Sequence, residues 1–317
     1  MNQQFNISNT TLWLLGGIIA ILVISSITGF ILSRLSTSEG SRKTIDNLNS
    51  RIRSWWVMVA VFSAAMIIGK GGSVLLFAFT SFWAFREFIT LTPTHRGDHR
   101  TLFWVFFVIT PIQYYLVYIN WYGLFCIMIP VYAFLFVPIR NALAGDCERF
   151  LERTAKIQWG LMICVYCVSH APMVLTLNIP GFKNQGANLL FFLVTVTQLS
   201  DVFQYVFGKT LGKHKIAPNV SPNKTWEGFI GGILTATLLG AGLWWATPFS
   251  PWQAAGMALA ITLLGFAGGL TMSAIKRDRG VKDYGKLIAG HGGVMDRIDS
   301  ICFAAPVFFH LTRFFFT

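Results

Sequence analysis

The sequence predicts an all-α polytopic integral membrane protein with about nine to ten transmembrane helices and an active site at the cytoplasmic membrane interface. Three observations predict the class. Hydrophobic residues make up 54% of the chain, the mean hydropathy is +0.58, and uncharged apolar runs recur along all 317 residues. A helix needs ~20 apolar residues to cross a bilayer, whereas a soluble protein of this length alternates apolar and polar faces. The composition therefore excludes an ordinary soluble globular protein.

Ten apolar runs are candidate spans. In chain order they cover residues 12–33, 54–69, 71–85, 102–118, 122–138, 157–177, 187–207, 228–246, 253–275 and 299–316. The second and third runs are short and meet at a GKGG turn that contains Lys70. This hairpin is therefore expected to cross the membrane incompletely. The first run is too long for a signal-peptide core and lacks a basic segment before it, so we expect it to stay as a helix.

Basic residues are distributed unevenly between the loops. If the uncharged N-terminus lies outside, 22 of the 25 Lys and Arg residues fall on the inner side, and only Lys70, Lys183 and Arg313 lie outside. Lys and Arg concentrate in cytoplasmic loops. We therefore expect cytoplasmic inner loops, both chain ends outside, and location in a bacterial inner membrane. The net charge of +12 suits anionic headgroups and nucleotides, although positive-inside loops alone would also make the chain basic. No nucleic-acid partner is expected.

The inner loop that begins in the seventh run, residues 198–232, is rich in glycine and lysine. Asp201 lies inside the apolar run, where a charge at the centre of an isolated helix costs ~2.5–3.5 kcal/mol, so it should face a polar cavity and a partner. Glycine turns expose backbone N–H groups and lysines supply positive charge, so the loop could cradle a polyphosphate. A solvated turn is the alternative, because no P-loop pattern is present. The candidate substrate-binding residues here are Lys209, Ser221, Pro222, Lys224 and Glu227.

A second inner loop, KRDRGVKDYGKLIAGHGGVMDRID at residues 276–299, is densely charged: ten of its 24 residues, against 12% of the chain. Its six basic and four acidic residues nearly balance, which argues against a simple positive anchor. At the start of the last helix, Asp296 and Asp299 would share one face near the positive helix end. With Asp283 and Asp201 they would form an oxygen-rich Mg²⁺ site. The alternative for each carboxylate is a salt bridge to a neighbouring Arg or Lys.

Cations beside carboxylates and a divalent ion are what phosphoryl and nucleotidyl transfer require, because that chemistry consists mostly of positioning and charge neutralisation. His291 lies in a GHGG turn and could serve as an acid, a base, a phosphate donor or a turn residue; we favour a substrate contact, together with Gly292 and Gly293. The candidate catalytic cations are Lys276, Arg277, Lys282 and Arg297.

These two loops resemble the phosphatidate cytidylyltransferase (CDP-diacylglycerol synthase) family. The second loop matches the family signature of Ser, two residues, Lys-Arg, four residues, Lys-Asp, then His-Gly-Gly, two residues, Asp-Arg, one residue and Asp, which runs from Ser273 to Asp299. The upstream loop matches through Asp201 and the segment SPNKTWEG. Two positions depart from the pattern: Ala289 stands where the family usually has Pro, Gly or Ser, and Gln204 where Ala is commoner.

The resemblance implies a membrane enzyme of phospholipid biosynthesis that condenses CTP with phosphatidic acid to CDP-diacylglycerol and pyrophosphate. It also implies a requirement for Mg²⁺, with a second cation left open, and a homodimer among membrane lipids. In this interpretation the four aspartates carry the metal, the cations neutralise triphosphate and lipid phosphate, and His291 with its glycines shapes the phosphate pocket. The similarity favours a catalytic transmembrane domain over residues 101–317 and an N-terminal transmembrane extension over residues 1–100.

Three alternatives stay open. A related enzyme could act on another lipid, such as an isoprenoid-based one, as a cytidylyltransferase or as a CTP-dependent kinase, which would release CDP in place of pyrophosphate. A transporter would carry ionisable residues at mid-depth in several spans, whereas here they gather at the inner ends of the seventh, ninth and tenth spans. A non-enzymatic relative that binds lipid or nucleotide without turnover is the third.

Overall fold

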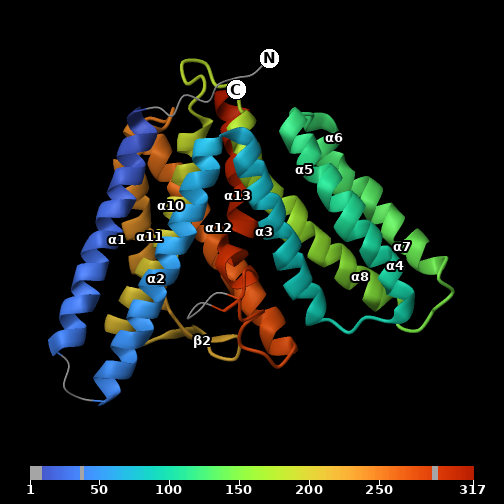
Figure 1. Ribbon diagram of the computed structural model, residues 1–317, viewed down its shortest axis with the longest axis horizontal. Coiled ribbons are helices and arrows are strands. Elements are labelled where there is room, and N and C mark those ends of the chain that lie inside the picture. Colours follow the sequence, from blue (N-terminus) through green and yellow to red (C-terminus); the bar gives the residue numbers. More distant parts are fainter. Residues whose placement is uncertain (1–8, 36–38, 288–291) are drawn as a thin grey trace.

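The computed structural model describes residues 9–35, 39–287 and 292–317. Figure 1 shows a bundle of long helices in which α1 begins and α13 ends at the same end, and a short β-hairpin lies at the other. Nine helical segments of the described chain are long and apolar enough to cross a membrane. The predicted class, an all-α polytopic membrane protein, is confirmed.

The elements follow the predicted runs closely. The N-terminal part consists of α1 (Asn9–Leu35), α2 (Glu39–Ile68) and α3 (Lys70–Thr90). Three composite rods follow, each with a π-helical stretch inside: η1 (Arg96–Asp98), α4 (His99–Trp104), η2 (Val105–Ile109) and α5 (Thr110–Ile119); α6 (Tyr122–Ile127), η3 (Met128–Ala133) and α7 (Phe134–Ala142); α8 (Phe150–Leu161), η4 (Met162–Cys167), α9 (Val168–Met173) and η5 (Val174–Thr176). The C-terminal part contains α10 (Gly186–Thr210), β1 (Lys215–Ala217), β2 (Ser221–Thr225), α11 (Trp226–Gly242), η6 (Trp244–Ala246), α12 (Pro251–Asp278) and α13 (Met295–Phe316).

The helical hairpin at the GKGG turn differs from the expectation. Helix α2 has 30 residues and α3 has 21, so both reach the length of a full crossing. Only Gly69, at φ 92°, separates them, and a Cβ at Gly72 would lie 2.6 Å from the Ala65 carbonyl oxygen. The short spans predicted here are wrong, because glycine permits a one-residue turn and polar residues extend both helices beyond their apolar windows.

The loop at residues 198–232 also contains structure that the sequence analysis did not anticipate. Strands β1 and β2 pair antiparallel, with Lys215 opposite Thr225 and Ala217 opposite Ser221. The Thr225 hydroxyl then accepts a hydrogen bond from the Gly228 amide at 3.2 Å and caps α11, as threonine commonly does at a helix start. The segment SPNKTWEG is therefore a strand followed by a helix cap.

Helices α10, α11, α12 and α13 pack against one another and position the hairpin. A Cβ at Gly228 would lie 2.7 Å from the Gln204 carbonyl oxygen, and one at Gly232 would lie 2.7 Å from the Gln204 amide nitrogen. Helices α10 and α11 therefore pack closely at these two glycines. The larger side chain of Gln204 fits because Gly232 leaves it room, and its amide donates to Ser200 Oγ at 2.8 Å.

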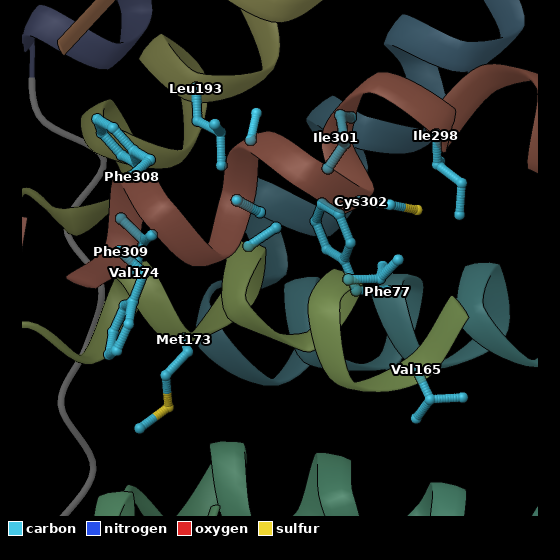
Figure 2. Close-up of a cluster of buried hydrophobic side chains, with 14 of the residues drawn as sticks. Phe77, Val165, Met173, Val174, Leu193, Ile298, Ile301, Cys302, Phe308 and Phe309 are labelled. Atoms are coloured by element: carbon cyan, nitrogen blue, oxygen red, sulfur yellow. The ribbon is translucent and has the colours of Figure 1, made fainter. Parts of the chain in front are cut away.

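The hydrophobic core joins the C-terminal helices to α3 and α9. Figure 2 shows Phe77 of α3 in the same cluster as Val165, Leu193, Ile301 and Phe308. Helix α3 packs against α5, α9 and α13. The division into an N-terminal extension over residues 1–100 and a catalytic domain over residues 101–317 stays a prediction, but α3 of the N-terminal segment packs into the core that supports α13.

Candidate active site

The β-hairpin, the C-terminal parts of α10 and α12 and the start of α13 meet at one end of the bundle (Figure 1). Five of the predicted site residues interact electrostatically there, although they lie far apart in the sequence. They are Asp201 of α10, Lys224 of β2, Lys276 of α12, and Arg297 and Asp299 of α13.

The carboxylates of Asp201 and Asp299 form the centre of this cluster. The Ser300 hydroxyl donates to Asp201 Oδ2 at 2.9 Å, and the Ser300 amide donates to Asp299 Oδ1 at 2.8 Å. The other oxygen of each carboxylate has no hydrogen-bond donor in the described ranges. Two adjacent, partly buried carboxylates repel each other and are stable only beside cations.

Lys224 supplies one of these cations from the β-hairpin. Its ammonium lies 4.4 Å from the centroid of the Phe266 ring and 3.5 Å from the Phe266 carbonyl oxygen. A Cβ at Gly269 would lie 3.1 Å from this ammonium and 3.8 Å from Asp299 Oδ2, so the glycine makes room for the pair to approach. Burial lowers the pKa of Lys224, against the opposing effect of Asp201 and Asp299.

Arg297 supplies the second cation. Its Nε is buried and has no hydrogen-bond partner among the described residues. The Arg297 carbonyl oxygen accepts a hydrogen bond from Gln198 Nε2 at 3.1 Å, which ties the first turn of α13 to α10. Buried donors are nearly always satisfied, so this guanidinium is suited to an anionic oxygen from a ligand.

Asp296 lies in a different environment from Asp299. Its Oδ1 accepts from the Lys276 ammonium at 2.8 Å, and its Oδ2 accepts from the amides of Tyr284 at 2.8 Å and Gly293 at 3.0 Å. Asp296 is 7% exposed and Lys276 9%. Both oxygens of Asp296 thus hold the loop at residues 276–299, called the signature loop below. The contact with Lys276 is the salt bridge that was the alternative to metal binding. A metal-binding role for Asp296 stays a prediction.

The rest of the signature loop is more exposed. Lys282 and Asp283 lie at the surface, with Asp283 Cβ 3.2 Å from a Cβ built on Gly292. Gly292 has φ 79°, and a Cβ there would also lie 2.8 Å from Asp296 Oδ2, so glycine is required on both counts. The predicted substrate contact His291 lies outside the described residues, as does Ala289.

Arg277 connects the end of α12 to the loops around it. Its Nη1 donates to the Val281 carbonyl oxygen at 2.9 Å, and its Nε donates to the Val220 carbonyl oxygen at 3.3 Å. Since Val220 lies in the turn between β1 and β2, this arginine holds the hairpin against α12.

Glu227 joins the two ends of the hairpin segment. Its carboxylate accepts from His214 Nδ1 at 2.6 Å and from the Lys213 amide at 3.0 Å. The His214 ring and these backbone amides lower the pKa of Glu227 to about 2. The other predicted substrate-binding residues of this segment are solvent-accessible: Ser221 and Pro222 on β2, and Lys209, whose ammonium lies 5.9 Å from the Tyr205 ring centroid.

The described chain contains no group of three or more His, Cys, Asp or Glu side chains that could hold a metal ion. The structure thus couples Asp201 with Asp299, whereas Asp296 is engaged by Lys276 and two loop amides and Asp283 is exposed. A carboxylate pair nevertheless fits Mg²⁺, which typically uses one or two carboxylates, several waters and substrate phosphates.

Comparison with known proteins agrees with this geometry. A model of the cytidylyltransferase family matches residues 49–315. The chain belongs to the cytidylyltransferase family. It is therefore a membrane-embedded nucleotidyltransferase, and the predicted resemblance is confirmed. The family match also begins well before residue 100, upstream of the motifs from which the resemblance was inferred.

Individual relatives of this cytidylyltransferase carry different names. An uncharacterized protein of Escherichia coli (strain K12), YnbB, is 40% identical over 95% of this chain and 97% of its own length. A phosphatidate cytidylyltransferase of Staphylococcus aureus (strain COL) is 32% identical over 58% of this chain and 74% of its own. A phosphatidate cytidylyltransferase of Mycobacterium leprae (strain TN) is 40% identical over 40% of this chain and 41% of its own.

Two residues of this cytidylyltransferase site were missed by sequence reasoning. Ser300 contacts both central carboxylates, and Gly269 makes room for Lys224. The signal for Ser300 was its position next to Asp299, on the polar face at the start of an apolar helix. Gly269 has no local sequence signal, since its contact with Lys224 depends on the position of the hairpin.

Proposed function

We propose that this cytidylyltransferase condenses CTP with phosphatidic acid and forms CDP-diacylglycerol and pyrophosphate. The observation that carries the proposal is the pairing of Asp201 and Asp299 with Lys224 and Arg297 at the end of a helical bundle. The names of the Staphylococcus aureus and Mycobacterium leprae relatives support the choice of lipid. Such a reaction belongs to phospholipid biosynthesis.

The reaction needs little acid–base help from the protein. A phosphate monoester has a second pKa near ~6, so the lipid phosphate is already an anionic nucleophile at neutral pH. Its oxygen forms a bond to the α-phosphorus of CTP, and the bond from that phosphorus to the β-phosphate oxygen breaks, so that pyrophosphate leaves. The main obstacles are the repulsion between two anions and the charge that develops on pyrophosphate, both of which positioned cations reduce.

The residues of the site divide between these tasks. Lys224 and Arg297 would bind phosphate oxygens, with the unsatisfied Arg297 Nε as a ready donor. The exposed Lys282 and Lys209 would attract CTP from solution. The backbone at Gly292 and Gly293 would line the phosphate pocket. Lys276 and Arg277 would act indirectly by fixing the signature loop and the hairpin.

Magnesium is the cofactor that this site would take. Asp201 and Asp299 would hold it through their oxygens without hydrogen-bond donors, and substrate phosphates would complete the coordination. Binding by Asp283 through a water stays a prediction. A bound divalent ion would neutralise triphosphate charge. The protein residues then orient the two substrates and balance the remaining negative charge.

The orientation and assembly are part of the proposal. The positive-inside distribution supports an orientation with the candidate site on the cytoplasmic side of a bacterial inner membrane, where CTP is available and the acyl chains can stay in the bilayer. We also propose a homodimer, on the resemblance alone.

The test is a reconstitution assay. The purified protein in detergent or proteoliposomes is incubated with CTP, Mg²⁺ and dioleoyl phosphatidic acid, and both pyrophosphate and the lipid product are measured. Equal amounts of pyrophosphate and CDP-diacylglycerol are expected. An Asp299→Asn variant is the control for the site.

Two outcomes would contradict the proposal and point to a different activity. Turnover with a polyprenyl phosphate and not with phosphatidic acid would keep the reaction and change the lipid. Release of CDP in place of pyrophosphate would identify a CTP-dependent lipid kinase.

A further inference from the structure

The N-terminus of α13 is capped by a residue from a distant helix. Glu87 of α3 accepts hydrogen bonds from the Val294 amide at 3.1 Å and from the Met295 amide at 2.9 Å, one on each carboxylate oxygen. It is 6% exposed. A helix start leaves several amide groups without partners and carries partial positive charge, so a carboxylate there satisfies donors and balances the helix dipole.

The sequence at the start of α13 provides no side-chain cap of its own. Val294 occupies the N-cap position and has no side-chain acceptor, and no local side chain caps α13. Ser, Thr, Asp or Asn normally fills this position. The helix that carries Arg297, Asp299 and Ser300 therefore depends for its first turn on a residue from outside the signature.

Two glycines of the signature loop fit around the Glu87 carboxylate. A Cβ at Gly285 would lie 2.8 Å from Glu87 Cδ, and one at Gly293 would lie 2.7 Å from the same atom. The three nearest atoms to a Cβ at Gly293 all belong to Glu87. These glycines lack positive φ values, so the space for the carboxylate, and not the backbone conformation, accounts for glycine there.

We propose that Glu87 is a positioning residue of the enzyme: it fixes the start of α13 so that Asp299 and Ser300 meet Asp201. The inference rests on the proposed function for its kinetic readout, but not for its structural one. Glu87 would act through α13, since both of its oxygens are already engaged by amides of that helix. Asp296 holds the other side of the same loop through Tyr284 and Gly293.

The first test measures the cap directly. Amide hydrogen exchange of the peptide around residues 292–297 is compared between wild type, Glu87→Gln, Glu87→Ala and Ser81→Ala in detergent. Exchange at Val294 and Met295 should accelerate by about 10- to 100-fold in both Glu87 variants, the range typical for loss of a hydrogen bond to a charged group. Ser81→Ala is the matched control, because Ser81 is equally buried on α3 but bonds Tyr114 at 2.5 Å. Unchanged exchange in Glu87→Gln, which keeps the side-chain volume, would overturn the proposal.

The second test separates positioning from general damage. Because both Glu87 oxygens are engaged by amides of α13, we expect kcat to fall by about 10- to 100-fold in Glu87→Gln while KM for CTP changes less than about threefold. Glu87→Asp should recover part of the loss. A kcat of Glu87→Gln within twofold of that of Ser81→Ala would refute the positioning role. If the wild type itself does not use phosphatidic acid, the proposed substrate fails, while the exchange experiment still decides the cap.

A double-mutant cycle with Gly293 tests the steric argument. Gly293→Ala alone should lose activity because the new methyl group overlaps the Glu87 carboxylate. In the Glu87→Ala background that overlap disappears, so adding Gly293→Ala should lower activity by less than about twofold further. Independent, multiplicative losses from the two substitutions would contradict the fit between Glu87 and Gly293.

Discussion

Removing the ammonium of Lys224 is the sharpest test of the site. In Lys224→Gln, Asp201 and Asp299 lose one of the two cations that act on both of them, and the substrate phosphates lose a positive group. The hydrogen bond of Lys224 to Phe266 is long, at 3.5 Å, so charge accounts for most of the effect. A single positioned electrostatic donor in an active site is worth about 2.7–4 kcal/mol. We therefore expect kcat/KM to fall by about 100- to 1000-fold.

The assay is the initial rate of pyrophosphate release with CTP, Mg²⁺ and phosphatidic acid, normalised to monodisperse protein. Lys215→Gln is the matched control: it removes the same charge from the same hairpin, but Lys215 is exposed on β1, and surface changes are usually within about 0.5 kcal/mol. A Lys224→Gln rate within threefold of Lys215→Gln would refute the assignment of Lys224 to the site.

Three further predictions concern the remaining charges. Asp296→Asn should lower the free energy of unfolding by about 3–5 kcal/mol, because it leaves the buried Lys276 ammonium unpaired; thermal unfolding measures this. A variant that is as stable as the wild type and only twofold less active would contradict both the structural and the metal-binding role of Asp296. Chelation of Mg²⁺ should abolish turnover, and Asp201→Asn should raise the Mg²⁺ concentration for half-maximal rate at least about tenfold; an unchanged Mg²⁺ titration would exclude Asp201 as a ligand. The His214 ring lowers the pKa of Glu227 to about 2, so the contact between Glu227 and the hairpin should be fully present above the ordinary carboxyl pKa of ~4.3 and be lost only as the pH falls toward 2. Trp226 fluorescence should therefore be flat from pH 7 to about 4. A transition near pH 5 in the wild type that Glu227→Gln lacks would contradict this.

The helices were predictable because membrane crossing imposes a length and an apolar composition that the sequence displays openly. The pairing of Asp201 with the signature loop was also predictable: a carboxylate inside an apolar run needs a partner, and the charged loop was the available one. The meeting of Asp201 with Asp299 follows from this argument together with the family motif.

Other parts of the site depend on tertiary contacts that have no local pattern. Asp296 and Asp299 are three residues apart and were expected to act alike, but Lys276 and two loop amides engage Asp296, while Asp299 faces Asp201. Sequence spacing specifies a helix face and does not say which partner reaches it. Glu87 was missed because its contact with α13 joins segments about 200 residues apart, as the separation of 207 positions to Val294 shows.

The β-hairpin gives the enzyme two levels of stability. Lys224 is carried by a two-stranded element at the edge of the helical bundle, where the Thr225 cap, the Glu227 contacts and Arg277 help to hold it. Two-stranded hairpins are marginally stable alone, and such units open locally before the whole fold unfolds. Warming should thus inactivate the enzyme reversibly at temperatures at which the helical bundle is still intact, because the cation leaves the carboxylates while the bundle persists.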